Sequence, residues 1–121
     1  MNASRQHIAL DLNRQDSMEY VEVRQGDTAK VVSAGLTAGS VPYELTDDVT
    51  AVLAARKIGG TYAYANATVS ENRIIVMIPA AITAAAGKYE ACFHLSGSGA
   101  GSLSTPSFMI CVNEPAAPEE T

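Results

Sequence analysis

The sequence contains no tryptophan, only two cysteines and only two histidines among its 121 residues. Two cysteines are too few for the disulfide framework that stabilises small secreted domains, so the core has to come from apolar packing. Two histidines leave little material for nucleophilic or metal-dependent catalysis. Hydrophobic residues make up 47% of the chain, which is enough for a single domain of this length to bury a sizeable core.

Charge and long apolar runs are also scarce. Charged residues make up 17% of the chain, with a net charge of −5. The eight Lys and Arg residues are scattered, so no basic stripe can neutralise phosphates and we expect no nucleic-acid partner. No apolar run approaches the ~20 residues of a membrane-spanning helix, so we expect no membrane partner. The N-terminal "MNASRQHIALDLNRQD" lacks the apolar core of a signal peptide, and we expect synthesis in the cytoplasm.

Short apolar segments separated by turn signals occupy most of the chain. They predict strands at 7–12, 18–24, 29–36, 41–45, 49–57, 61–70, 73–79, 88–95 and 106–112. Pro42 places its strand at a sheet edge, and Glu71-Asn72 predicts a tight turn. "AAITAAAG" predicts one short helix around 80–86, which begins after Pro79 and ends at Gly87. We therefore expect one all-β domain, an antiparallel β-sandwich over residues 1–112, followed at 113–121 by an acidic, proline-rich tail or the start of a linker.

Alternation along the last two predicted strands indicates which side chains face the core. The inward positions are Tyr89, Ala91, Phe93, Leu95, Phe108, Ile110 and Val112. Cys92 and Cys111 then face outward. Because Cys92 follows Tyr89 by three residues, it cannot take the place of the inward cysteine of an antibody-type domain. We therefore expect an immunoglobulin-like sandwich without an inter-sheet disulfide.

The outward positions of these strands raise the question of a metal site. Cys92 and His94 could meet Met109 and Cys111 on an adjacent strand as ligands for a soft metal. No Cys-x-x-Cys spacing supports this, so we predict no metal site and no cofactor. We interpret this face as a weakly apolar surface that a neighbouring subunit covers.

Catalytic patterns are missing as well. His94 has no serine or acid beside it in the sequence, and "GSGAGS" joins two predicted strands instead of opening a helix, so we interpret it as a mobile hairpin loop. Asp27 follows Gly26 in a break between strands, where it can bond backbone N–H groups of the turn. We therefore predict no catalytic residue, and we expect that the protein is not an enzyme.

The order of these features resembles a known family. "LDLN" is followed by "VRQGD", "VPYELTDDVTAVLAARKIGGT", "AAITAAAGKYEACF" and "STPSFMICV", and this order is similar to the N-terminal domain of phage baseplate upper proteins from about His7 to Val112. Family members often have Asp-Gly where this chain has Gly59-Gly60, which leaves the turn intact. The resemblance implies an immunoglobulin-like β-sandwich that docks to itself or to other virion proteins, without catalysis or cofactor.

We therefore expect a structural virion protein made in the host cytoplasm: a baseplate or tail component, or a related head-fibre or capsid accessory protein. It would act through protein–protein interfaces as a homo-oligomer. The interface candidates are Ile75, Met77, His94, Met109, Val41, Tyr43 and Leu45. The alternative is a carbohydrate-binding or adhesive β-sandwich module that contacts host-surface glycans. Such modules display aromatic rings, and Tyr62 and Tyr64 share one face of a strand. We interpret both as core residues, because the core has few other aromatics.

Overall fold

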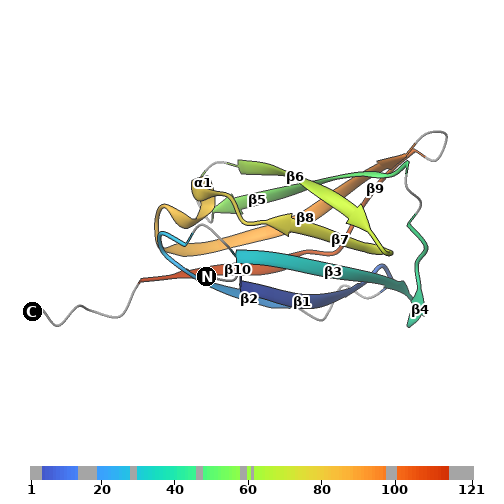
Figure 1. Ribbon diagram of the computed structural model, residues 1–121, viewed down its shortest axis with the longest axis horizontal. Helices are drawn as coiled ribbons and strands as arrows, with labels where there is room; N and C mark the ends of the chain where they lie inside the picture. Colours follow the sequence, from blue (N-terminus) through green and yellow to red (C-terminus); the bar gives the residue numbers. More distant parts are fainter. Residues whose placement is uncertain are drawn as a thin grey trace, which may run out of the picture.

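The structure, a computed structural model, describes residues 4–13, 19–27, 30–45, 48–57, 60, 62–97 and 101–114 (Figure 1). It contains ten strands and one short helix. The strands are β1 (Ser4–Asp11), β2 (Tyr20–Arg24), β3 (Lys30–Ala38), β4 (Val41–Pro42), β5 (Thr50–Lys57), β6 (Tyr62–Ser70), β7 (Arg73–Met77), β8 (Gly87–Gly97), β9 (Gly101–Ser104) and β10 (Phe108–Asn113), and the helix is α1 (Ala80–Thr83). No helix in the described ranges is long and apolar enough to cross a membrane.

One continuous sheet forms the whole domain, in the order β1-β3-β7-β6-β5-β8-β10-β2. Strand β6 joins the two halves, because residues 62–67 pair with β5 and residues 68–70 pair with β7. The sheet folds back on itself at β6 into a sandwich-like, nearly closed barrel. The all-β sandwich fold is therefore confirmed, and both cysteines are free, as expected for a domain without an inter-sheet disulfide.

The two edges of the sheet differ from the antiparallel arrangement that we expected throughout. Strand β1 is parallel to β3, and β2 is parallel to β10. The edges face each other, and side chains bridge the seam: the Gln6 side-chain amide donates to the carbonyl of Tyr20 (2.8 Å), and the Ala9 N–H donates to the carboxylate of Glu19 (3.3 Å). Parallel strands that pair are far apart in sequence, so turn motifs in the sequence do not predict their pairing.

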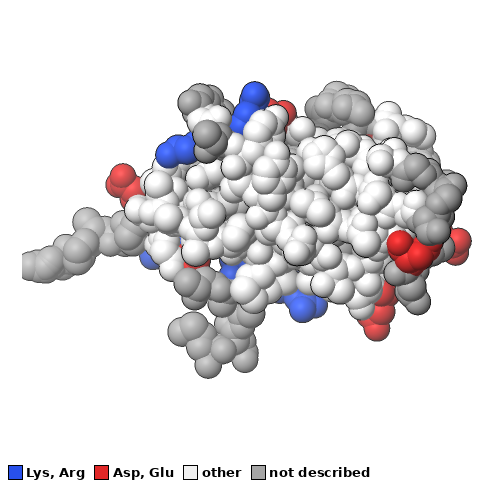
Figure 2. Space-filling model, turned by 90° about the horizontal axis from the view of Figure 1, so that it is seen from above, with Lys and Arg blue, Asp and Glu red and all other residues white. Residues whose placement is uncertain are grey.

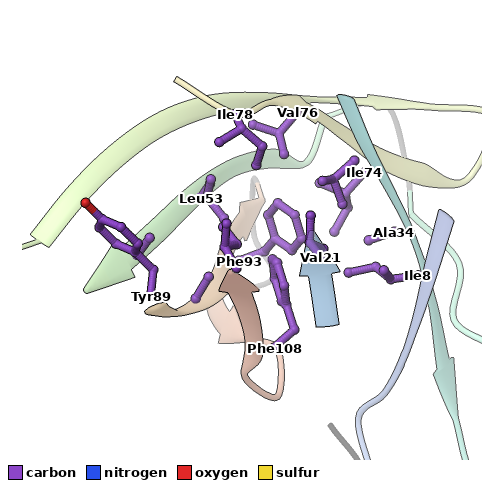
Figure 3. Close-up of a cluster of buried hydrophobic side chains, with 14 of the residues drawn as sticks. Ile8, Val21, Ala34, Leu53, Ile74, Val76, Ile78, Tyr89, Phe93 and Phe108 are labelled. Atoms are coloured by element: carbon purple, nitrogen blue, oxygen red, sulfur yellow. The ribbon is translucent and has the colours of Figure 1, made fainter. Parts of the chain in front are cut away.

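The core lies between the two halves and is centred on Phe93 and Phe108, whose ring centroids are 5.5 Å apart (Figure 3). Both rings are fully buried. The inward face predicted from alternation is confirmed, since the seven predicted core residues of β8 and β10 are all at most 6% exposed. The core cluster also includes Val21, Leu53 and Ile74, from strands in both halves of the sheet (Figure 3).

The strand predictions hold in most places, with local corrections. Glu71 and Asn72 have positive φ angles of 52° and 63°, as the predicted tight turn requires. The predicted strand at 41–45 is regular only at Val41–Pro42, although the Tyr43 N–H still donates to the Leu36 carbonyl (2.9 Å). The predicted glycine-rich loop is shorter than expected, because β9 pairs back onto β8. Residues 98–100, and the first residues of three predicted strands (Met18, Ala29 and Thr61), lie outside the described residues.

The helix is one turn long, and the prediction that it ends at Gly87 was wrong. It ends at Thr83, and Gly87 instead opens β8 with φ +148°. The carbonyl groups at the end of α1 are occupied by the neighbouring corner: that of Thr83 accepts the Gly26 N–H (2.8 Å), and that of Ala84 accepts the Gln25 side-chain amide (3.0 Å). These bonds replace the next helical turn. The tail at 115–121 lies outside the described residues, so the domain boundary after 112 stays a prediction.

Candidate functional site

The corner at Gly26-Asp27 joins β2 to β3 and is tied to α1. Gly26 has φ +89°, and the Asp27 carboxylate accepts the Arg24 N–H (3.1 Å). The Thr83 hydroxyl donates to the Asp27 carbonyl (2.8 Å). The carboxylate therefore stabilises the turn by accepting from an N–H three residues back. These bonds give Asp27 a structural role in the turn.

Only half of the soft-metal constellation comes together. Cys92 and His94 are neighbours on the outer face of β8, with 3.9 Å between Sγ and Nε2. Met109 pairs with Glu90 and Cys111 with Lys88, so neither lies opposite Cys92. Cys111 is also only 7% exposed, although alternation turns it away from the core. No group of three metal-ligating side chains occurs among the described residues.

The surroundings of Cys92 and His94 favour the thiol form. Burial raises the pKa of the Cys92 thiol, and the nearby Glu90 carboxylate raises it further. A thiol with a raised pKa is a poor nucleophile at neutral pH. Strand β9 brings Ser104 to His94, with 2.8 Å between Oγ and Nδ1. Sequence reasoning missed this contact, because the serine is ten positions away. With Cys92 instead of an acid at its other nitrogen, His94 does not form a hydrolase triad.

Tyr62 and Tyr64 lie on the surface, so our interpretation of them as core residues was wrong. They are 57% and 62% exposed, and their rings stack with centroids 5.9 Å apart. The inward positions of this part of β6 hold Ala63, Ala65 and Ala67, which pack against the core. The strand therefore fills its core side with small residues and presents its aromatic rings to solvent.

A broad surface without charged side chains covers the outside of β6, of α1 and of β7 from Ile75 onward. We call it the uncharged face, and its members are Tyr62, Tyr64, Asn66, Thr68, Ser70, Ile75, Met77, Ala80 and Ala81. Figure 2, seen from the side of β6 and α1, shows a wide central area with no Lys, Arg, Asp or Glu. Met77, in this face, is 53% exposed. The signal is present in the sequence, because only Glu71 and Arg73 are charged among the 30 residues from 58 to 87.

The seven interface candidates fall in three places. Ile75 and Met77 lie in the uncharged face. Val41 and Tyr43 are 63% and 37% exposed at the β4 end of the sheet (Figure 1), whereas Leu45 is half-buried against the core. The remaining two, the exposed His94 and the half-buried Met109, lie on the outer faces of β8 and β10. The structure therefore does not unite them in one patch.

A large open hollow of about 560 Å³ lies over β1 and β3. Arg73 lines it, and its guanidinium donates to the Ser33 carbonyl (2.9 Å) and to the Ser33 hydroxyl. The guanidinium lies against Gly35, where an added Cβ would come within 2.9 Å of Nη1. Arg73 thus fastens β7 to β3.

The described residues thus define a class: an all-β module with a broad uncharged face and without a group of three metal-ligating side chains. The family follows from comparison with known proteins. The chain belongs to the family of the BppU N-terminal domain, whose model matches residues 4–117. It is a structural protein of the phage baseplate, it is part of the virion, and it interacts with other virion proteins. The family resemblance seen in the sequence is therefore confirmed.

The fold also matches a solved structure. The N-terminal domain of phage TP901-1 ORF48 superposes with a TM-score of 0.72, covers 91% of this chain and is itself covered to 98%, at 13% sequence identity. At that identity the likeness concerns the fold. No curated protein matches the chain.

Proposed function

We propose that this baseplate domain binds its neighbours in the virion through the uncharged face and also associates with itself. The observation that carries the proposal is the absence of charged side chains among the members of the uncharged face, together with the exposed rings of Tyr62 and Tyr64 and the exposed Met77. The buried centres of protein interfaces are depleted in charged residues and enriched in tyrosine and methionine. A charged side chain there would lose its water without gaining a partner.

A second contact region lies at the edge strand β4. Val41 and Tyr43 point to the same side and are exposed. Pro42 has no N–H to donate, so a partner strand cannot pair fully along this edge. We therefore assign Val41 and Tyr43 a contact through side chains and not through strand addition, with Leu45 anchoring the segment to the core.

We propose that the domain has no enzymatic activity and no catalytic cofactor, and that it binds neither nucleic acid nor membrane. The net charge of −5 and the scattered basic residues support the absence of a nucleic-acid partner. We also propose synthesis in the host cytoplasm.

The test places a charge in the middle of the uncharged face. Thr68 is exposed, so Thr68→Lys leaves the core untouched. An unpaired charge in a closed interface costs about 2–5 kcal/mol, equivalent to a loss of affinity from about 30-fold to several thousand-fold. We expect Thr68→Lys to fold normally by circular dichroism but to fail to enter baseplates in a phage complementation assay followed by electron microscopy.

The matched control is Ala9→Lys, which adds the same charge at an exposed position of β1, outside the uncharged face. It should assemble like the unmodified protein. Normal assembly of Thr68→Lys, or equal failure of both variants, would show that the uncharged face is not the contact surface.

A second candidate function is favoured by the exposure of Tyr62 and Tyr64. The two rings stack and are exposed to solvent. They lie beside the amide of Asn66 and the ion pair of Arg56 with Glu90. The surface therefore offers both apolar and hydrogen-bonding groups, as a sugar ring requires. A glycan array tests this role in host-surface attachment. Glycan binding should be lost in Tyr62→Ala and Tyr64→Ala but kept in Tyr20→Ala, which changes another exposed tyrosine. This result would support the glycan-binding role, and the absence of any bound glycan on the array would exclude it.

A further inference from the structure

Cys92 and His94 form a pair of metal-ligating groups on the outer face of β8. They are two residues apart on one strand and therefore point the same way. Cys92 is half-buried, His94 is exposed, and 3.9 Å separates Sγ from Nε2. Thiolate and imidazole are the usual ligands of protein-bound zinc.

The spacing of the two atoms suits a shared tetrahedral metal. Zinc binds sulfur at about 2.3 Å and nitrogen at about 2.0–2.1 Å, so a tetrahedral angle places the two ligand atoms about 3.6 Å apart. The 3.9 Å between Sγ of Cys92 and Nε2 of His94 differs from this by about 0.3 Å. A small rotation of either side chain closes the difference.

Ser104 orients the histidine for this task. Its hydroxyl lies 2.8 Å from His94 Nδ1. In the tautomer that donates Nδ1–H to this hydroxyl, Nε2 keeps its lone pair and faces Cys92. Metal-binding histidines usually have such a partner on the second nitrogen, which holds the ring and sets the tautomer.

One chain supplies only two ligands, because the described residues contain no group of three. An isologous contact between two copies brings the same surface together twice. It thus provides two thiolates and two imidazoles, a complete ligand set for structural zinc. The two thiolates balance the charge of Zn²⁺.

The surface in front of the pair leaves room for such a contact. A hollow of about 240 Å³ opens beside Cys92 and His94. The charged side chains that line it are Arg56 and Glu90, 3.6 Å apart. Because they offset each other, two copies that meet here do not present like charges to one another.

We infer that Cys92 and His94 form half of a zinc site, which a second copy of the chain completes as a Cys2His2 centre across a two-fold axis. Binding removes one proton from each Cys92 thiol, and both protons go to solvent. The contact is centred on β8 and β9 and borders the uncharged face at Tyr62, which lines the same hollow. It therefore adds a metal-dependent mode of self-association to the proposed function.

The experiment uses the full chain, stripped of metal and kept reduced, with zinc chloride as the probe. Sedimentation and metal analysis should show that zinc converts monomer to dimer with one zinc per two chains. Cobalt(II) in place of zinc should give the absorption of a tetrahedral sulfur-containing site. Zinc bound one-to-one without dimer formation, or a dimer that reductant dissolves and zinc does not affect, would overturn the inference.

The composition of the chain provides matched controls, because it has one further cysteine and one further histidine. Cys92→Ser and His94→Gln should each raise the zinc concentration needed for dimer formation by about 100-fold or more, whereas Cys111→Ser and His7→Gln should leave it unchanged. Loss of about 10-fold in Ser104→Ala, with the cobalt spectrum preserved, would identify Ser104 as a positioning residue. Equal effects of the site and control variants would refute the assignment.

The two proposals can fail separately. Thr68→Lys lies outside the zinc contact and should leave the zinc-dependent dimer intact while it blocks baseplate entry. Cys92→Ser should lose the zinc-dependent dimer but still enter baseplates. If Cys92→Ser also blocks entry into baseplates, zinc-dependent self-association is a step of assembly. If zinc has no effect on either variant or on the unmodified chain, the zinc site is excluded, and the proposed role of the uncharged face is unaffected.

Discussion

The stacked pair at the centre of the core allows a quantitative test of the fold. Phe93 and Phe108 are 0% exposed, with centroids 5.5 Å apart and planes 28° apart. Replacing either with leucine removes three buried carbons, which costs about 2 kcal/mol at ~0.8 kcal/mol per carbon. An aromatic pair adds about 1 kcal/mol beyond its burial. Each single variant should therefore lose about 3 kcal/mol of unfolding free energy.

The double variant separates the two contributions. It loses the burial at both sites but the pair energy only once, so it should cost about 5 kcal/mol instead of the 6 of an additive pair. Domains of this size are stable by about 5–15 kcal/mol, so the double variant sits near the threshold of folding. The coupling of about 1 kcal/mol between Phe93 and Phe108 is the quantity to measure.

Urea unfolding followed by far-UV circular dichroism is the appropriate assay, because the chain has no tryptophan for fluorescence. The slope of the unfolding free energy with urea should stay constant across the four proteins, which shows that the same surface is exposed in each. If the effects of Phe93→Leu and Phe108→Leu add to within about 0.3 kcal/mol, the rings gain nothing from each other and the argument fails.

Three further predictions concern turns and the strand ends. The pKa of Asp11 is lowered to about 2 by hydrogen bonds from the backbone N–H groups of Ser40, Asn13 and Gly39 and from the Thr37 hydroxyl. The contribution of the Asp11 carboxylate to stability is complete above pH ~4 and is lost as the pH falls towards ~2. Asp11→Asn should therefore flatten acid unfolding curves in that pH window. Asp27→Ala removes the bond to the Arg24 N–H and should cost about 1 kcal/mol in urea unfolding; no change would contradict its role in the corner. Gly87→Ala puts a Cβ at φ +148°, 3.0 Å from Lys57 Cε, and should cost about 1–3 kcal/mol; an unchanged melting temperature would show that the strand start relaxes freely.

The parts of the fold that the sequence predicted are those that depend on neighbours in the chain. Alternation in β8 identified Phe93 and Leu95 as core residues, and the pair Glu71-Asn72 identified a turn with positive φ. Both depend on side-chain type over a few positions. The family could be recognised for the same reason, since its turn and strand motifs are local.

The remaining features depend on partners that are distant in sequence. The length of α1 is limited by bonds from Gln25 and Gly26, about 59 positions away. The exposure of Tyr62 and Tyr64 follows from the space available to Ala63 and Ala65 between the two halves of the sheet, which composition alone does not reveal. The bond between His94 and Ser104 needs the β8–β9 register. In each case tertiary packing overrode a local preference.

The parallel pairing of β2 with β10 affects how the protein is made. Tyr20 and Met109 are partners 89 positions apart (109 − 20), so β2 can pair with β10 only after most of the domain has been synthesised. Contacts of such separation slow folding, because a long loop has to close first. During synthesis the edge of β2 stays open until the last strand leaves the ribosome. The sheet is therefore completed only after translation has passed β10.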